Sequence, residues 1–308
     1  MSLVAALKGR GPSGYGYGST ADEVVSGLDL SGKNILITGC NSGLGKYTME
    51  TLSGAGARVI AAARTEEKAS EAIKGLKTPA RPIACELSEP ASVRACVDAL
   101  REDDEQIDVI LCNAGIMALP KLHLQHGYEL QFFTNHIGHF MLVTGLLDQL
   151  SDTGRVVIVS SSAHQMAPSA GIEFDNLDGQ KGYSAWRAYG QSKLANILCA
   201  RELARRLEGT GKTANALHPG VIMTNLGRHS QGAVMNFVGD TLGKAIFLKS
   251  IPQGAATQTY VSVHPDASQH SGEYFADCNV SSTTKHGRDV EMAKKLWARS
   301  EEIVASLS

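Results

Sequence analysis

The 308-residue sequence lacks the features that mark several classes of protein. Its six cysteines are dispersed and none forms a Cys-x-x-Cys pair, so we expect buried free thiols in a reducing compartment and no disulfide scaffold. No stretch reaches the roughly 18 apolar residues of a membrane helix, and the apolar run at 3–7 is shorter than the about 7–15 residues of a signal-peptide core. Lys and Arg total 29 against 31 Asp and Glu, without the basic excess of a nucleic-acid binder. These absences predict a cytoplasmic protein with no membrane anchor and no nucleic-acid partner.

What the sequence does contain is an alternation of short β-branched runs and longer amphipathic segments, after a glycine-rich extension over residues 1–30. Strands are expected at 34–38, 58–62, 81–86, 108–112, 155–159 and 213–218. Helices are expected at 43–54, 65–76, 89–101, 127–150 and 184–208, with a short capped helix from Thr20 to about Gly27. Such alternation predicts an α/β fold with a doubly wound parallel sheet, in one domain over residues 31–308.

A glycine-rich turn follows the first expected strand, with the spacing Gly39-x-x-x-Gly43-x-Gly45. Glycines let the chain turn sharply and bring backbone amides close to a pyrophosphate, while the N-terminus of the next helix adds partial positive charge. The spacing differs from the commonest Gly-x-Gly-x-x-Gly fingerprint. Its place between a strand and a helix predicts a dinucleotide site, and a structural turn without a ligand is the alternative.

The end of the second expected strand bears on the choice of dinucleotide. NAD enzymes often place an acidic residue there to hold the ribose hydroxyls, whereas this strand is followed directly by Arg64. A guanidinium suits the 2′-phosphate of NADP through charge-assisted hydrogen bonds, which favours NADP over NAD. A solvated Arg64 is the alternative. Lys46 is a second candidate for the phosphate charge and could equally lie on the helix surface.

The reactive groups are predicted from a tyrosine and a lysine four residues apart, Tyr189 and Lys193, within an expected helix. Residues i and i+4 share a helix face, so the phenol and the ammonium can point into one site. A nearby ammonium favours the phenolate and would lower the pKa of about 10 that a free tyrosine has. An ordinary pair on a helix surface is the alternative. Upstream, the serines at 160–162 end a strand at the edge where open α/β sheets place their ligands.

Together these motifs resemble those of the short-chain dehydrogenase/reductase family over residues 31–308. The motifs that carry the resemblance are Thr38-Gly39-x-x-x-Gly43-x-Gly45, Asn113-Ala114-Gly115, Asn135, Ser161, Tyr189-x-x-x-Lys193 and His218-Pro219-Gly220. Longer stretches at 113–117, 135–140, 189–196 and 271–275 resemble its retinol-dehydrogenase-like branch. The resemblance implies a Rossmann fold and an oxidoreductase that transfers a hydride between a nicotinamide cofactor and an alcohol or carbonyl compound, without a metal.

The resemblance also implies roles for single residues. Tyr189 would be the general acid in carbonyl reduction and the base in alcohol oxidation, with Lys193 binding the nicotinamide ribose and lowering the tyrosine pKa. Ser161 would polarise the substrate oxygen, and Asn135 would anchor a water and the lysine in a proton relay. Together with Arg64, the cofactor-binding residues would be Gly39, Asn41, Ser42, Gly43, Leu44, Gly45, Glu86, Leu87, Asn113, Ala114, Gly115, Tyr189, Lys193, Pro219, Gly220, Val221, Ile222 and Thr224.

Two features depart from the family's pattern. Glu86 stands where the family commonly has an aspartate that touches adenine, and its longer side chain can still reach. Membrane-bound retinol dehydrogenases carry a hydrophobic N-terminal anchor, whereas this chain has a polar, glycine-rich extension, which weakens the case for a retinoid substrate.

By the same resemblance, a mobile substrate lid is expected at about 225–254. Its apolar residues favour a small hydrophobic alcohol, ketone or aldehyde, although an ordinary helix with a core face fits the same pattern. No metal site is predicted, because the histidines at 123, 126, 136 and 139 have no neighbouring acid or cysteine cluster. The alternative function is an NADP-binding sensor or interaction protein with little turnover. A nucleotide-sugar epimerase is disfavoured because Ser42 stands where that group has glycine. The resemblance also implies a homodimer or homotetramer, since many family members form one.

Overall fold

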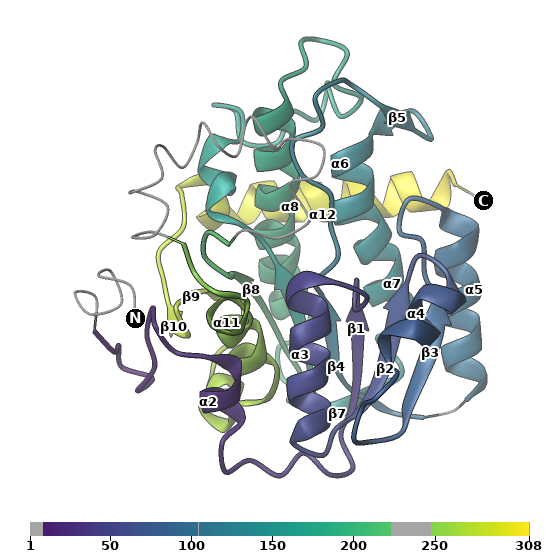
Figure 1. Ribbon diagram of the computed structural model, residues 1–308. Helices are drawn as coiled ribbons and strands as arrows, with labels where there is room; N and C mark the ends of the chain where they lie inside the picture. Colours follow the sequence, from purple (N-terminus) through teal and green to yellow (C-terminus); the bar gives the residue numbers. More distant parts are fainter. Residues whose placement is uncertain (1–8, 104, 223–247, 308) are drawn as a thin grey trace.

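The computed structural model describes residues 9–103, 105–222 and 248–307 (Figure 1). Within these residues the main sheet has eight strands in the order β10-β9-β8-β7-β4-β1-β2-β3, and neighbours run parallel except for β9 and β10. The strands are β1 (Asn34–Thr38), β2 (Arg58–Ala63), β3 (Ala80–Ala84), β4 (Ile107–Cys112), β7 (Leu150–Val159), β8 (Thr213–His218), β9 (Tyr274–Ala276) and β10 (Asn279–Val280). The strand order reverses between β1 and β4, and the predicted doubly wound α/β fold is confirmed.

Helices cover both faces of this sheet, which explains why its central strands read as unbroken apolar runs. The covering helices are α3 (Gly43–Gly54), α4 (Glu66–Ala72), α5 (Pro90–Glu102), α7 (Gly138–Leu146), α8 (Ala185–Arg206), α11 (Ile251–Val263) and α12 (Val290–Ala305). In β1, Ile35 and Ile37 point into the core shared with α3 and α11, while Leu36 between them points into the core shared with α5, α7, α8 and α12. In Figure 1, α3 and α11 lie in front of the strands.

The helix expected at 127–150 is wrong in its extent. The segment begins with β6 (Tyr128–Glu129), which pairs in a short hairpin with the preceding β5 (Leu124–Gln125). The helical turn α6 (Leu130–Phe132), the π-helical turn η1 (Phe133–Ile137) and then α7 follow. Pairing with segments far away in the sequence limits the helix at its end. The Ile107 amide donates to the Gln149 carbonyl, and β7 already begins at Leu150 rather than at 155. Similarly, α4 and β3 end earlier than expected, at Ala72 and Ala84.

The N-terminal residues 9–30 pack against the sheet's helices rather than extending from the molecule. Thr20 caps α2 (Ala21–Val25): its side chain accepts a hydrogen bond from the Glu23 amide, and the Glu23 side chain accepts one from the Thr20 amide. This is the predicted capping box. The helix α2 then contacts α11 and α3. Residues 225–247 of the expected lid lie outside the described residues. The end of the expected lid overlaps the start of α11 at Ile251. The division into an extension and one domain stays a prediction.

Candidate active site

The reactive residues gather at the carboxyl ends of the central strands. Tyr189 lies in the second turn of α8 and Lys193 follows one turn later, with its Nζ 5.7 Å from the centroid of the Tyr189 ring. Both residues are buried, at 4% and 3% exposure, which rules out the alternative of a pair on the helix surface. Ser161 follows β7, and its side chain lies near enough to the Tyr189 phenol to favour the ionised form. The structure therefore brings together three of the residues that the sequence predicted as catalytic.

Burial determines the protonation of the Tyr189 phenol. It raises the pKa of Tyr189 to about 12, and the nearby Ser161 side chain opposes this rise. The lowering of this pKa by Lys193, which the sequence predicted, is not found in this structure. Desolvation disfavours the charged phenolate more than its neighbours stabilise it, so the phenol holds its proton at neutral pH.

Lys193 is held by the strand next to its helix. Its Nζ donates to the Val159 carbonyl at 3.0 Å, and the same carbonyl accepts a bond from Asn196 Nδ2 at 3.1 Å. Burial lowers the pKa of Lys193 to about 8, with Cys112 acting in the opposite direction. The amine is therefore mostly protonated at neutral pH, but far more readily neutralised than a surface lysine.

Asn135 occupies the π-helical turn η1, a type of helix distortion that is frequent at functional sites. Its Oδ1 accepts from the Ile116 amide at 2.8 Å, and its Nδ2 donates to the Ile116 carbonyl at 2.9 Å and to Ser192 Oγ at 2.9 Å. A Cβ atom on Gly115 would come within 3.0 Å of Asn135 Oδ1 and 3.4 Å of Lys193 Nζ. The side chain of Asn135 thus ties the loop after β4 to α8, and Gly115 leaves room between them.

The glycine-rich turn is packed against the loop after β4. Asn113 Nδ2 donates to the Thr38 carbonyl at 2.8 Å. A Cβ atom on Gly45 would overlap both Asn113 Nδ2 and the Gly39 carbonyl, and one on Gly39 would come within 3.0 Å of Ala114. Gly39 also has a φ of 69°, in the left-handed region that favours glycine. Both glycines are therefore required for the close approach of the two loops.

A buried hydrogen-bond network surrounds Thr38, the last residue of β1. The sequence did not predict this network, because it identified Thr38 only as part of the glycine-rich motif. Thr38 Oγ1 accepts from the amides of Asn113 and Ala114, each at 3.0 Å, and lies 2.8 Å from His139 Nε2. His139 Nδ1 lies 3.1 Å from the Asn135 carbonyl, which can only accept, so Nδ1 carries the proton and Nε2 accepts from Thr38. Burial lowers the pKa of His139 to about 4, which keeps the ring neutral.

The groups around the turn fit the phosphates of a dinucleotide. Ser42 is the N-cap of the twelve-residue helix α3, but its side chain makes no capping hydrogen bond, which leaves the first amides of α3 for an anion. Arg64 directly follows β2, which pairs in register with β1, and its side chain is exposed. Lys46 instead lies on the surface of α3, 3.9 Å from Glu50 in an i, i+4 pair. Among the predicted residues of this turn, Asn41 is exposed and Leu44 is half-buried.

The two predicted adenine contacts have different surroundings. The Glu86 carboxylate accepts hydrogen bonds from the amide and the hydroxyl of Ser88, at 3.3 and 3.0 Å. Leu87 is buried at 3% exposure, and its main chain packs so closely on Gly138 that a Cβ atom there would overlap the Leu87 carbonyl. The Leu87 side chain thus belongs to the core, which leaves its backbone for any contact with a ligand.

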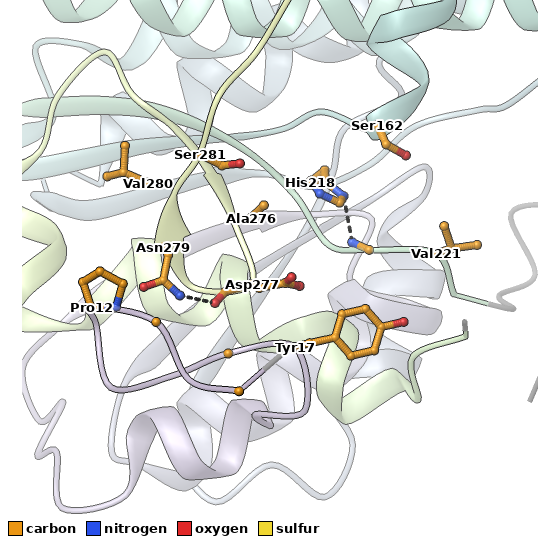
Figure 2. A pocket seen from close by; sticks show the side chains of 14 residues that line it. Pro12, Tyr17, Ser162, His218, Val221, Ala276, Asp277, Asn279, Val280 and Ser281 are labelled. Carbon is orange, nitrogen blue, oxygen red and sulfur yellow. Dashed lines mark hydrogen bonds between the residues drawn. The ribbon is translucent and has the colours of Figure 1, made fainter. Parts of the chain in front are cut away.

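The segment predicted to touch the nicotinamide follows β8. The Gly220 amide donates to His218 Nδ1 at 3.1 Å (Figure 2). Lys249 holds this segment from behind: its amide donates to the Val221 carbonyl at 2.9 Å, and a Cβ atom on Gly220 would come within 2.8 Å of its side chain. Pro219 and Ile222 are half-buried in the same segment, whereas the predicted Thr224 lies outside the described residues. No signal in the sequence pointed to Lys249.

The remaining titratable groups of the described residues do not form a metal site. Over residues 9–103, 105–222 and 248–307, no three or more His, Cys, Asp or Glu side chains come together as a metal site would require. All six cysteines are in this part of the chain and are buried free thiols, as predicted. His136 is buried as well, and burial lowers its pKa to about 3. Within the same described ranges, no helix has the length and apolarity needed to cross a membrane.

Comparison with known proteins gives close similarity over the whole chain. Residues 33–174 match the family model of the short chain dehydrogenase. The chain is 40% identical to the short-chain dehydrogenase TIC 32 A, chloroplastic, of Brassica napus, and the match covers all of both proteins. It is 38% identical to retinol dehydrogenase 14 of Homo sapiens, over 90% of this chain and 88% of that protein.

Solved structures agree with this similarity. A crystal structure of an uncharacterized protein from Mycobacterium paratuberculosis superposes with a TM-score of 0.75 and is 32% identical, covering 94% of this chain and 98% of the other. The angucycline C-6 ketoreductase LanV, solved with bound NADP, has a TM-score of 0.64 and covers 80% of this chain and 94% of its own. At 22% identity, the ketoreductase supports the fold alone.

Proposed function

This chain belongs to the short-chain dehydrogenase family, and from this premise we propose that it is an NADP-preferring enzyme that acts on a hydrophobic alcohol or carbonyl compound. Its full-length relatives establish it as an NAD(P)-dependent oxidoreductase that acts on CH–OH groups. We add to this assignment the preference for NADP, the apolar substrate and the roles of single residues.

One observation carries the proposal. The buried phenol of Tyr189 lies beside the buried amine of Lys193 at the carboxyl edge of the sheet, and the Ser161 side chain is near enough to favour its ionised form. Open α/β sheets bind their ligands at this edge, where the strand order reverses. A sensor or interaction protein has no need of a proton donor buried at its nucleotide site, so the arrangement favours turnover.

The chain's own residues hold the reactants and move the proton. The bound dinucleotide supplies or accepts the hydride. Tyr189 donates its phenolic proton to the substrate oxygen in reduction and, as the phenolate, takes a proton from the alcohol in oxidation, while Ser161 holds that oxygen by a hydrogen bond. Because burial raises the pKa of Tyr189 to about 12, the phenol carries a proton at neutral pH, which suits the acid role in carbonyl reduction. Lys193 binds the nicotinamide ribose, and Asn135 holds the loop after β4 beside it.

The preference for NADP rests on Arg64. It is exposed directly after β2, at the end of the strand that lies beside the glycine-rich turn, and no acidic residue occupies this strand end. A guanidinium forms charge-assisted hydrogen bonds with a phosphate, each stronger than a bond to a neutral hydroxyl. Arg64 is therefore proposed to bind the 2′-phosphate of NADP.

The test follows oxidation of NADPH and of NADH separately against a panel of apolar aldehydes and ketones, including retinal because several relatives are named retinol dehydrogenases. We expect turnover with NADPH, and its loss in Tyr189→Phe with NADPH binding retained. Arg64→Gln should lower kcat/KM for NADPH at least about tenfold with little change for NADH, whereas the surface control Lys46→Gln should change neither. Equal or better turnover with NADH in the wild-type enzyme would refute the role of Arg64. NADPH binding without reduction of any compound would favour the sensor.

The proposal also includes the cellular location and the oligomeric state of the enzyme. The cytoplasmic location expected from the sequence stays a prediction, since the relatives from Brassica napus are named as chloroplastic. The homodimer or homotetramer implied by the family also stays a prediction, for which the molar mass in solution is the measurement.

A further inference from the structure

A pocket of about 610 Å³ lies beside the candidate active site, between the N-terminal loop and the last strands of the sheet (Figure 2). Its lining comes from residues of the loop 9–17, from 218–221 after β8, from 276–281 around the turn between β9 and β10, and from Ser162. Ser162 is the direct neighbour of Ser161, and 220–221 belong to the segment proposed to touch the nicotinamide. The pocket thus lies next to chain neighbours of the reacting groups, while Ser161, Tyr189 and Lys193 themselves do not line it.

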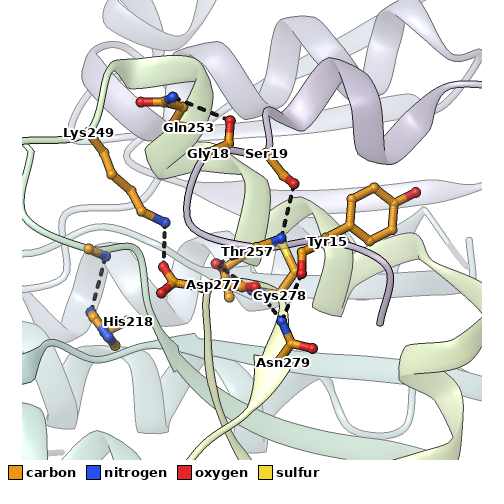
Figure 3. Close-up of polar contacts among 12 residues, drawn as sticks. Tyr15, Gly18, Ser19, His218, Lys249, Gln253, Thr257, Asp277, Cys278 and Asn279 are labelled. Carbon is orange, nitrogen blue, oxygen red and sulfur yellow. Dashed lines mark hydrogen bonds and ion pairs between the residues drawn. The ribbon is translucent and has the colours of Figure 1, made fainter. Parts of the chain in front are cut away.

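The N-terminal loop is tied firmly to the wall of this pocket. Asn279, the first residue of β10, holds the loop by two hydrogen bonds: the Ser13 amide donates to its Oδ1 at 3.0 Å. Its Nδ2 donates to the Tyr15 carbonyl at 3.1 Å (Figure 3). Within the loop, the Gly11 amide donates to the Tyr15 carbonyl at 2.7 Å. A Cβ atom on Gly11 would come within 2.5 Å of the Asn279 side chain. The loop therefore has a defined shape that depends on contacts with the far end of the chain.

Two tyrosines of this loop have different surroundings. The Tyr15 ring packs edge-on against Tyr260 of α11 and against His264, which follows this helix, with ring centroids 5.6 and 5.5 Å apart. Tyr15 does not line the pocket. The Tyr17 ring lines the pocket, with Lys249 Nζ 4.8 Å from its centroid. Tyr15 thus anchors the loop on α11, while Tyr17 contributes to the pocket surface.

The charge at this wall is compensated. Lys249 Nζ pairs with Asp277 at 2.6 Å (Figure 3), and its side chain is fully buried. The Tyr17 ring lies against this amine. Burial raises the pKa of Tyr17, and the Asp277 carboxylate adds to this effect, so the phenol stays neutral. The remaining lining is mostly small and apolar and includes Pro12 and Val280. Such a wall suits an uncharged molecule with an apolar body. An anion would be repelled by the Asp277 carboxylate, and the Lys249 amine is already paired with that carboxylate.

We propose that the N-terminal loop 9–17 forms a wall of the substrate pocket and that Tyr17 sets the size of the uncharged alcohol or carbonyl compound that the enzyme accepts. The proposal rests on the proposed function, because it assigns the pocket to the substrate of that same reaction. Tyr17 acts as a specificity-determining residue: its ring lines the pocket on the side of Val221 (Figure 2), and its removal enlarges the space for the body of the substrate.

The experiment compares benzaldehyde with para-tert-butylbenzaldehyde, two aldehydes that differ only at the end away from the carbonyl. In Tyr17→Ala, the ratio of kcat/KM for the bulky aldehyde to that for benzaldehyde should rise about tenfold over wild type, while the Kd for NADPH stays unchanged. The matched control is Tyr15→Leu, which alters the same loop but not the pocket lining and should leave the ratio within about twofold. Thermal unfolding checks that the variants fold, and Tyr17→Leu replaces the alanine variant if it does not.

The outcomes separate this inference from the proposed function. If the wild-type enzyme reduces neither aldehyde nor any compound of the wider panel, the proposed function fails and the inference fails with it. If the wild-type enzyme is active but Tyr17→Ala or Tyr17→Leu leaves the ratio unchanged, only the inference is overturned. An equal change of the ratio in Tyr15→Leu would also overturn it, since the effect would then come from a displaced loop and not from the Tyr17 ring.

Discussion

Replacing Lys193 by methionine should make the protein more stable while it abolishes turnover. Burial lowers the pKa of Lys193 from 10.5 to about 8. Since one pKa unit corresponds to about 1.4 kcal/mol, the charged amine costs the folded state about 3 kcal/mol at pH 7. Methionine fills a similar volume without the charge, and the loss of the hydrogen bond to Val159 offsets about 1 kcal/mol of this gain. The Val159 carbonyl keeps its bond from Asn196, so no buried acceptor is left unpaired.

The net expectation for Lys193→Met is a free energy of unfolding about 2 kcal/mol higher at pH 7, with a Tm higher by about 4 °C. The gain should depend on pH. Below about pH 8 the lysine is protonated in both the folded and the unfolded chain, and the folded state bears the full cost. Above about pH 10.5 the amine is neutral in both states and the cost vanishes. Wild-type stability relative to the variant therefore rises with pH between these values.

Urea unfolding of both proteins at pH 7, 8, 9 and 10 measures this difference, and subtraction removes the contribution of the other groups that titrate at high pH. Lys46→Met is the matched control, because Lys46 is exposed, and its stability should stay within about 0.5 kcal/mol of wild type at every pH. A stability gain of Lys193→Met that is the same at pH 7 and pH 10 would show that the buried charge does not carry the cost. A loss of stability at pH 7 would contradict the whole calculation.

Three further substitutions test other parts of the site. Gly45→Ala should weaken NADPH binding at least about tenfold, measured by fluorescence titration, because the new methyl group overlaps Asn113; unchanged affinity would show that the turn adapts. Asn135→Ala should lower the free energy of unfolding by about 2–4 kcal/mol, since it leaves the half-buried amide and carbonyl of Ile116 without these bonds. A loss below about 1 kcal/mol in urea unfolding would contradict this. Lys249→Met should lower the free energy of unfolding by about 2–3 kcal/mol, because it leaves the half-buried Asp277 without its cation. Adding Asp277→Asn should recover most of this loss, and no recovery in the double variant would rule out the ion pair as the cause.

Much of the fold and of the site follows from local patterns in the sequence. The strand expected at 213–218 and the helix expected at 43–54 have the observed bounds, because each is a short run whose own periodicity and flanking residues define it. The approach of Tyr189 to Lys193 follows from the helical period alone. The spacing of the glycines at 39 and 45 predicted a sharp turn close to a pyrophosphate, whereas their close packing on the loop after β4 is seen only in the structure.

The tertiary structure alone decided the features that depend on residues far apart in the chain. The expected helix at 127–150 is distorted and shortened because distant segments pair with its ends. The direction of the Tyr189 pKa shift depends on how completely the surrounding helices and strands remove water, and not on the nearby lysine. The N-terminal loop takes its place from Asn279, more than 260 residues later. Periodicity and motifs report only the hydrogen bonds and faces within one segment, whereas burial and long-range pairing arise when segments without any local signal for each other come together in the folded chain.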